Sequence, residues 1–492
     1  MIKILYAEST VQVNVNGVLT EAFKIERGVK QGCPLSAALY ILAINPLLKR
    51  IKSDKRLSGV KTSGGERVVV LAYADDVTVI IKNEKELNIV KEHLALYEEV
   101  SGSKLNHDKT EGVWFGRRET RPNLNLKYTE TMKVLGVTFC NNDSYSKNWD
   151  DKDKEIKEEL DKWESKSSCF KTKIMIIKTF IVSKILFLAT IFPPKEQTLK
   201  KINKTLVNFL WGTTREVTKR NLIYKSKRNG GLGAVDLGLK LKISFCKNVA
   251  SGFQRSAMWI GEALSWTKKK GRARTSVPYF KVLYGDLMTV SAHLNINWLD
   301  MSSKTIYCIL CDDLYGGIFP YKNLNDIQKQ VCIKNILSKN ISEKKRDVMW
   351  LVSVRRLAVR AVVKWSCFVT TTKCPMPNCD EDETIEHLLV ECQRAQYVWG
   401  EMAQIGLNFK ITNNAIMYGV FEERMSTMDQ EFFWTVICTV VNKIWNTRSV
   451  MVIHQETIYG EVVVSQIKTD LKRQRTLDLK QNRMRPWHLL SL

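Results

Sequence analysis

The chain has 492 residues, 44% of them hydrophobic, which is long and apolar enough for two to four domains with their own cores. Lys and Arg number 76 against 51 Asp and Glu, a formal charge of +25 that favours a polyanionic partner, with nucleic acid the first candidate. The longest apolar runs, such as 185–192, are far short of a membrane span, so no membrane partner is expected. The opening residues "MIKILYAEST" lack the pattern of a signal peptide and the twelve cysteines are scattered, so we expect an intracellular, reducing location.

The first 140 residues mix short β patterns with helical ones. Apolar and polar residues alternate on both sides of Asn16-Gly17, which is a strong signal for a β-hairpin. The stretch 37–51 is apolar and helical in pattern, and Pro46 is expected to kink or shorten that helix. This part of the chain therefore predicts a small α+β region.

Two carboxylates sit side by side in "LAYADDVTVI", residues 71–80. The apolar, β-branched runs on either side predict a hairpin whose turn exposes Asp75 and Asp76. Such acids can hold a divalent metal, although Ala-Asp-Asp is also ordinary turn chemistry. Because strand alternation sends adjacent side chains to opposite sides, Asp76 joins Asp75 only if the turn reorients it.

A helical pattern begins at Lys171 and ends at Pro193-Pro194. Apolar residues three and four positions apart share one face of it: Ile174, Ile177, Ile181, Ile185 and Leu188. Around this stripe stand lysines that predict a basic face for a nucleic-acid backbone: Lys171, Lys173, Lys178 and Lys184. The remainder of the chain is predicted to be mostly helical.

A Cys/His cluster lies in "CPMPNCDEDETIEHLLVEC". Four residues separate Cys374 from Cys379, and four separate His387 from Cys392, spacings that fall inside the range of zinc ligands. Three thiolates and one imidazole would make a closed structural zinc site. The alternative is four ordinary buried residues in a helical core.

Two basic clusters complete the pattern, at residues 267–274 and 472–487. Such runs can hold RNA or act as nuclear targeting signals, which makes the nucleus a candidate location. A solvated surface is the alternative explanation.

Four sequence blocks follow one another along the chain at plausible distances: "RGVKQGCPLS" (27–36), "YADD" (73–76), "SGSKLNHDKT" (101–110) and "KVLGVTF" (133–139). The series resembles motifs B to E of the reverse-transcriptase palm of non-LTR (LINE-type) retrotransposons. Residues 209–237 resemble the segment that follows the thumb in that family, and 374–399 resemble its C-terminal Cys/His motif. Many members of the family have two residues between the first two cysteines, where this chain has four.

The resemblance implies an α+β fold, a partial palm of antiparallel strands and helices followed by a mostly helical thumb and C-terminal region with a small zinc-knuckle-like motif. The implied domains are a palm at 1–140, a thumb-like region at 141–240, a helical connector at 241–345, a zinc-binding region at 346–410 and a basic helical tail at 411–492. RNA, RNA:DNA hybrid or DNA would be the partners.

The resemblance also implies roles for single residues. Asp75 and Asp76 would bind Mg²⁺ and Tyr73 would border the primer terminus. Residues near the template and the incoming nucleotide would be Arg27, Gly28, Lys30, Gln31 and Gly32. Lys104 or Lys109 would approach the triphosphate, although a solvated loop explains both lysines equally well. Cys374, Cys379, His387 and Cys392 would bind Zn²⁺.

A palm of this type takes its first metal-binding aspartate from a strand before the "QGCPLS" block. The first aspartate of this chain, Asp54, comes after that block, and the acids before it are Glu8, Glu21 and Glu26. We therefore expect a catalytically incomplete remnant of a reverse transcriptase that still binds nucleic acid. Two alternatives stay open: an active polymerase whose start lies further upstream, and a host-adopted nucleic-acid-binding protein without enzymatic activity.

Overall fold

The computed structural model describes residues 10–24, 28–29, 33–62, 65–116, 121, 123–124, 126–166, 169–255, 292–317, 324–364 and 369–492. The chain divides into two compact units. The N-terminal unit comprises residues 1–151 and 248–285, and the C-terminal unit comprises 152–247 and 286–492. The basic cluster at 267–274 lies outside the described residues.

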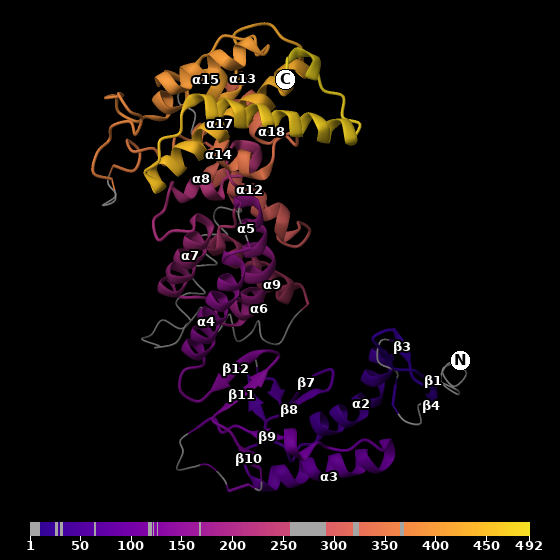
Figure 1. Cartoon of the computed structure of the whole chain (residues 1–492). Coiled ribbons are helices and arrows are strands. Elements are labelled where there is room, and N and C mark those ends of the chain that lie inside the picture. Colours follow the sequence, from indigo (N-terminus) through magenta and orange to yellow (C-terminus); the bar gives the residue numbers. More distant parts are fainter. Residues whose placement is uncertain are drawn as a thin grey trace. The chain divides into compact units, whose positions relative to one another are not determined.

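The N-terminal unit contains short strands around two long helices (Figure 1). The helices are α2 (Ser36–Ser53) and α3 (Glu84–Ser101), and a 3₁₀ turn, η1 (His107–Lys109), follows them. The strands are β1 (Thr10–Val11), β2 (Asn14–Val15), β3 (Val18–Leu19), β4 (Phe23–Lys24), β5 (Val60–Lys61), β6 (Arg67–Val68), β7 (Val70–Tyr73), β8 (Asp76–Val79), β9 (Glu111–Gly112), β10 (Lys127–Tyr128), β11 (Thr131–Val134) and β12 (Val137–Cys140).

These strands form two-stranded ladders among the described residues. Neighbours in the chain pair antiparallel in β2–β3, β5–β6, β7–β8 and β11–β12, β1 pairs antiparallel with β4, and β9 pairs parallel with β10. The predicted hairpin at Asn16-Gly17 is confirmed as β2–β3, with φ of 51° and 90° at the two turn residues.

Helices α2 and α3 pack together and form the small core of the N-terminal unit. Its fully buried side chains are Ile44, Leu47, Ile51, Leu57, Val69 and Val90. The expectation that Pro46 shortens its helix is wrong, because α2 continues to Ser53. Proline removes the amide that would bond to the carbonyl of Leu42, and the Leu42 side chain is 66% exposed, so water can reach this side of the helix.

The C-terminal unit is helical throughout the described residues (Figure 1). Helices α4 and α9 each cross the boundary between the two units. The helical elements are α4 (Ser144–Glu164), α5 (Phe170–Ile176), η3 (Ile177–Val182), α6 (Ser183–Ile191), α7 (Glu196–Trp211), α8 (Arg220–Tyr224), η4 (Lys227–Asn229), α9 (Leu237–Gln254), α12 (Ser303–Tyr315), α13 (Asp326–Ile336), α14 (Glu343–Ser353), η5 (His387–Glu391), α15 (Gln393–Gln404), α16 (Asn413–Tyr418), α17 (Thr427–His454), α18 (Gly460–Lys480) and η6 (Trp487–Leu489).

Helix α17 is the centre of the C-terminal core. Its residues 432–441 are all buried, and it packs against α14, α18 and η5. A helix that is apolar on every side requires neighbours on every side, which accounts for its central place. The α+β fold predicted from the sequence, with mainly antiparallel strand pairs followed by a mostly helical remainder, is confirmed.

The predicted helix from Lys171 is present as the continuous segment α5–η3–α6. The apolar runs of the sequence looked too short for a membrane span. By length and composition alone, however, the helical stretch Phe170–Ile191 is long and apolar enough to cross a membrane. Buried side chains from it, among them Ile174, Ile181 and Ile185, lie inside the C-terminal unit. This burial is what the core helix of a folded domain shows.

The four lysines of this segment bind other parts of the same unit. Lys171 pairs with Glu343 at 2.7 Å and Lys184 pairs with Glu159 at 3.1 Å. The ammonium groups of Lys173 and Lys178 donate to backbone carbonyls, and burial lowers the pKa of both. Tertiary contacts therefore engage all four, although Lys171 and Lys178 stay exposed, and the basic face toward a nucleic-acid backbone stays a prediction.

Candidate functional site

The two adjacent carboxylates lie at the turn of the β7–β8 hairpin. The strands pair from Val70 with Val79 to Tyr73 with Asp76, which leaves Ala74 and Asp75 as a two-residue turn. Ala74 has φ of +51°, in the left-handed region that a residue with a Cβ rarely adopts. The turn therefore holds its acids on a strained backbone, a feature that clusters at functional sites.

The register decides which way each acid faces. Residues paired across antiparallel strands share a face of the ladder, so Asp76 shares one face with Tyr73, Leu71 and Thr78. Asp75 belongs to the turn. The pKa of Tyr40 on α2 is raised, first by the burial of Tyr40 itself and second by the negative charge of Asp75. Both carboxylates are exposed. Tyr40 is a neighbour of the site that the sequence pattern did not indicate.

The face that carries Asp76 is apolar and uncovered by the described residues. On this face Leu71 is 54% exposed and Tyr73 is 68% exposed. Helix α2 packs on the opposite face of the hairpin, against Val70 and Val79. No described Asp, Glu, His or Cys joins Asp75 and Asp76 in a group of three at ligand distance. Within the described residues, the hairpin brings together two carboxylates, which are fewer ligands than a two-metal site requires.

The other residues predicted near this site fall into two groups. Arg27, Lys30, Gln31 and Gly32 lie outside the described residues. Gly28 is described, and its φ of +81° is one that glycine adopts readily. Lys104 and Lys109 are exposed, and neither forms a hydrogen bond or ion pair with Asp75 or Asp76 in the described parts of the chain; the amide of Lys109 instead donates to Asn106.

The structure brings together the four residues of the Cys/His cluster. One ligand atom from each of Cys374, Cys379, His387 and Cys392 lies within 4.8 Å of all the others. Cys379 Sγ is 3.3 Å from His387 Nε2. Cys374, His387 and Cys392 are buried, whereas Cys379 is partly exposed.

Local backbone geometry positions each half of this cluster. The bridge between Lys373 and Asp382 closes the loop that carries the first two cysteines, and Asn378 takes a left-handed φ of 58° just before Cys379. The second half lies on η5, a π-helical turn in which the amide of Cys392 donates to the carbonyl of His387 at 2.8 Å. A five-residue spacing falls on one side of a π-turn, whereas an α-helix would separate the two side chains.

The donor set fits a tetrahedral zinc ion. Zinc–sulfur bonds of about 2.3 Å place two ligands of a tetrahedron about 3.8 Å apart, so the observed cluster needs only a small contraction. Hydrogen bonds from Cys374 and from backbone amides at the start of α15 lower the pKa of the Cys392 thiol. A thiol held in this way is readily converted to the thiolate that binds metal.

A buried ion pair joins the segment 374–392, called here the metal loop, to helix α17. Glu383 is fully buried, and its carboxylate accepts from Arg448 Nε at 2.6 Å and from the amide of Arg360 at 2.8 Å. Sequence reasoning missed both Glu383 and Arg448. Glu383 is one acid in the run Asp-Glu-Asp-Glu, and nothing in the local pattern marks the partner 65 residues away.

Comparisons with known proteins agree on one family. Residues 1–139 match the family model described as reverse transcriptase (RNA-dependent DNA polymerase), and residues 320–399 match the one described as zinc-binding in reverse transcriptase. The first match contains the β7–β8 hairpin and the second contains the Cys/His cluster.

Three curated relatives are similar to parts of the chain. The "Transposon TX1 uncharacterized 149 kDa protein" of Xenopus laevis is 29% identical over 43% of this chain and 17% of its own length. The "Retrovirus-related Pol polyprotein from type-1 retrotransposable element R2" of Popillia japonica is 33% identical over 22% of this chain and 15% of its own length. The corresponding type-2 R2DM polyprotein of Drosophila melanogaster is 29% identical over 27% and 14%.

The chain thus spans less than a fifth of each of these relatives. In this chain the segment with the carboxylate hairpin comes first, and the segment with the Cys/His cluster follows it. In the two matched segments, residues 1–139 and 320–399, the chain is similar to the reverse transcriptases of non-LTR, LINE-type retrotransposons.

Proposed function

We propose that this chain forms part of an RNA-directed DNA polymerase, in which the N-terminal unit carries the metal-binding hairpin and the C-terminal unit carries a structural zinc site. The observation that carries the proposal is the strained two-residue turn that holds Asp75 beside Asp76, within the segment that matches the reverse-transcriptase family.

The chemistry expected of the hairpin is nucleotidyl transfer. Mg²⁺ lowers the pKa of the primer hydroxyl and neutralises charge on the leaving pyrophosphate, and hard cations of this kind prefer carboxylate oxygens. Asp75 and Asp76 are the residues that would hold it. Tyr73, exposed and on the same face as Asp76, would border the primer terminus.

We further propose that this chain, tested alone, does not synthesise DNA. Two carboxylates with no third acid near them among the described residues hold Mg²⁺ weakly, because this ion needs near-octahedral coordination. The exposed apolar face around Leu71 and Tyr73 would receive the polypeptide segment that supplies a further carboxylate.

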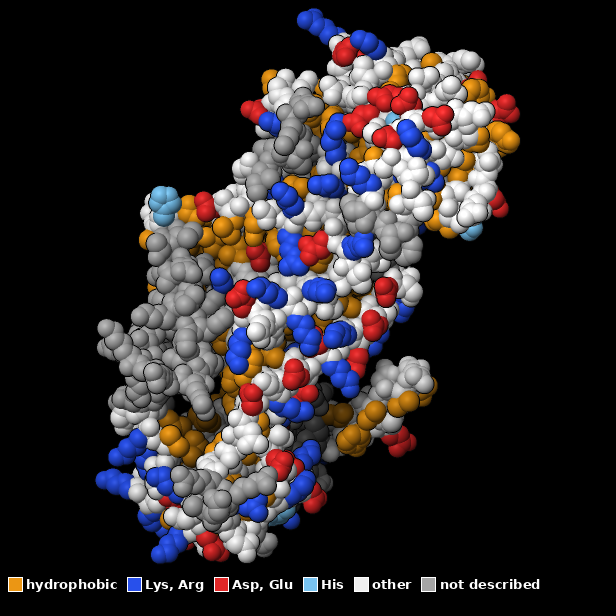
Figure 2. Space-filling model, turned by 90° about the vertical axis from the view of Figure 1, so that its left-hand side faces the viewer, with side chains coloured by type: hydrophobic (Ala, Val, Ile, Leu, Met, Phe, Trp, Pro, Cys, Tyr) orange, Lys and Arg blue, Asp and Glu red, His pale blue; other side chains and the backbone are white. Residues whose placement is uncertain are grey.

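The expected partner is RNA or an RNA:DNA hybrid. The formal charge of +25 supports this expectation, and Lys and Arg side chains are spread over the face shown in Figure 2 with Asp and Glu among them. On α18 and just after it, exposed cationic side chains follow one another: Lys472, Arg473, Arg475, Lys480 and Arg483. Contacts to phosphates through such residues would not depend on base sequence.

Primer extension tests the catalytic part of the proposal. The chain, its Asp75→Ala variant and a version lengthened upstream would be compared on an RNA template with Mg²⁺ or Mn²⁺. We expect no extension by the first two and Asp75-dependent extension by the lengthened protein. Extension by the chain alone that disappears in Asp75→Ala would show that the site is already complete. If the lengthened protein is equally inactive, a non-enzymatic nucleic-acid-binding role replaces the polymerase.

A filter-binding series tests the partner. Binding to RNA:DNA hybrid should weaken steeply between low and high salt, because each phosphate contact releases condensed counterions. Binding that does not change with salt would contradict an electrostatic interface.

A further inference from the structure

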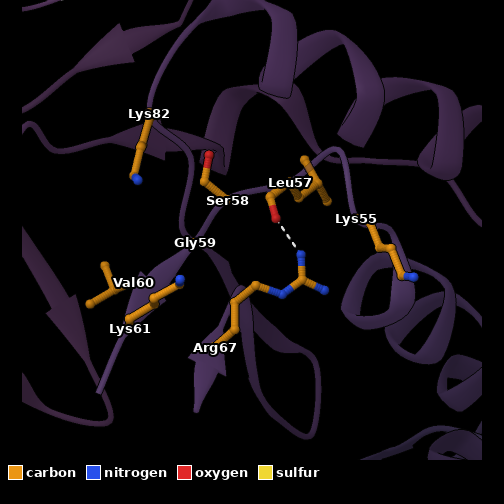
Figure 3. A pocket seen from close by; sticks show the side chains of 8 residues that line it. All are labelled: Lys55, Leu57, Ser58, Gly59, Val60, Lys61, Arg67 and Lys82. Carbon is orange, nitrogen blue, oxygen red and sulfur yellow. Dashed lines mark hydrogen bonds between the residues drawn. The ribbon is translucent and has the colours of Figure 1, made fainter. Parts of the chain in front are cut away.

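A pocket opens on the N-terminal unit away from the carboxylate turn. It has a volume of about 660 Å³ and is lined by Lys55, Leu57, Ser58, Gly59, Val60, Lys61, Arg67 and Lys82 (Figure 3). Four of these eight side chains are cationic, and none is acidic or aromatic. β6 precedes the first residue of β7 and Lys82 follows the last residue of β8, so the pocket lies toward the end of the hairpin opposite Asp75.

The wall of the pocket is held by buried side chains. Glu86, 4% exposed, accepts hydrogen bonds from the amides of Ser58 at 3.1 Å and Lys82 at 3.0 Å, and also from the Ser58 hydroxyl. The guanidinium of Arg67 donates to the carbonyls of Asp54 at 2.8 Å and Lys52 at 2.6 Å, and to that of Leu57. Arg67 therefore fixes the loop rather than offering its donors to a ligand.

Gly59 brings the loop against the neighbouring strand. Its φ is +57°, and a Cβ at this position would lie 2.3 Å from the carbonyl oxygen of Val68. No other residue fits without moving the backbone. The loop, β6 and the start of α3 thus form one pre-organised wall.

The lysines around this wall are available for a ligand. Lys55, Lys61 and Lys82 are exposed, and Lys55 and Lys61 form no hydrogen bond or ion pair with any residue that the structure describes. Lys82 has the buried Glu86 nearby, but that carboxylate already accepts three hydrogen bonds. In Figure 3, Lys61 and Lys82 flank one end of the pocket and Lys55 stands beyond Arg67 at the other.

We propose that this pocket binds the backbone phosphates of a nucleic-acid strand, at a place remote from the carboxylate turn; the proposal rests on the proposed nucleic-acid binding. Lysine ammonium groups bind phosphate as point charges. The lining offers no aromatic ring on which a base could stack and no free guanidinium fork to read a base edge, so the contact is independent of sequence. Ammonium groups at both ends of so large a pocket suit successive phosphates of a strand.

The test compares two double variants of the full chain that have the same net charge. Lys61→Gln/Lys82→Gln removes two pocket cations, and Lys49→Gln/Lys91→Gln removes two exposed lysines from α2 and α3 outside it. Binding of polyuridylate RNA is measured over a series of salt concentrations. Loss of two phosphate contacts should lower the slope of log Kd against log salt by about 1.4 and weaken binding on the order of tenfold or more near 0.1 M salt. The control pair should change the slope much less.

The outcomes separate the pocket from the proposed function. If the wild-type chain binds RNA and both double variants keep the same slope, the pocket proposal is overturned while nucleic-acid binding stands. If the wild-type chain does not bind RNA or hybrid at all, the proposed function fails and the pocket proposal fails with it. A third measurement is a titration with a nucleoside triphosphate. Tight binding that depends on Lys61 and Lys82 would assign the pocket to a mononucleotide and overturn the proposal that it binds a nucleic-acid strand. Circular dichroism of each variant verifies that these exposed substitutions leave the fold intact.

Discussion

The two units of this protein differ in how deeply they bury their candidate site residues, which are the Cys/His cluster in one and the two adjacent carboxylates in the other. In the C-terminal unit, the four Cys and His residues that could hold a metal come from one short segment, 374–392, which packs on the fully buried stretch 432–441 of α17. In the N-terminal unit, the carboxylates project from a two-residue turn, and apolar side chains beside them, including Leu71 and Tyr73, are more than half exposed.

This difference follows from where the ligands lie in the chain. Ligands within one local segment can be assembled by a turn and a π-helical bend, with little help from distant residues. The polymerase site proposed for the N-terminal unit would instead combine carboxylates from separate strands, so the hairpin alone would provide only part of it. The C-terminal cluster is therefore self-contained, whereas the described residues of the N-terminal unit place no third acid beside Asp75 and Asp76.

The largest expected effect tests the self-contained site. Replacing Cys379 with Ser should abolish zinc binding and destabilise the C-terminal unit by several kcal/mol, because metal binding and folding are coupled. Zinc content near one per chain in the wild type, measured by atomic emission, and thermal unfolding followed by tryptophan fluorescence would verify this. Cys308→Ser is the matched control, since Cys308 is exposed and outside the cluster. Freshly purified, reduced wild-type protein without zinc would contradict the metal assignment.

The second effect tests how the metal loop is fastened to α17. Glu383→Gln leaves the buried guanidinium of Arg448 without its charged partner, which should cost about 3–5 kcal/mol of unfolding free energy. Glu386→Gln changes the same chemistry three residues later, in a pair with the half-exposed Arg355, and should cost under about 1 kcal/mol. Denaturant unfolding of both variants measures the difference. Equal losses would mean that the buried pair does not hold the loop.

The third effect is a pH dependence inside the C-terminal unit. Burial raises the pKa of Asp347 to about 6. The hydrogen bond that its carboxylate accepts from the backbone amide of Phe170, at the start of α5, acts in the opposite direction but is the weaker effect. A raised folded-state pKa means that this group favours folding most below about pH 4, and that its contribution falls as the pH rises through about 6.

Asp347→Asn removes this ionisation and keeps an oxygen that can accept from Phe170. We expect the variant to be more stable than wild type by about 1–3 kcal/mol at pH 7.5 and similar to it near pH 4. Urea unfolding at the two pH values measures the change. A variant that is less stable at pH 7.5 would show that the carboxylate is held ionised.

The smallest effect concerns the strained turn of the N-terminal unit. Ala74→Gly should stabilise this unit by about 1 kcal/mol, because glycine adopts a φ of +51° without steric cost. Ala72→Gly, two residues earlier within β7, should instead destabilise it by about 0.5–1 kcal/mol. Hydrogen exchange of the hairpin amides would report both changes. Destabilisation by both substitutions would argue against strain at the turn.

The sequence by itself determined the features that depend on neighbouring residues. The hairpin at Asn16-Gly17, the paired acids of "YADD", the helix after Lys171 and the spacing of the Cys/His cluster all follow from local periodicity and turn chemistry. These patterns were enough to predict the α+β fold, and the resemblance of the ordered sequence blocks indicated the family. They could not show that Pro46 is tolerated inside α2, because that depends on which side of the helix faces water.

Only the tertiary structure decided which charged groups are available. Lys171 looked free in the sequence, but it pairs with Glu343, 172 positions away, and Glu383 finds Arg448 65 positions away. The guanidinium of Arg67 donates hydrogen bonds to nearby backbone carbonyls, whereas the side chains of Lys55 and Lys61 are exposed to solvent. The physical reason is that ion pairs and hydrogen bonds form between residues that packing brings together, and no local pattern records which distant residues those are.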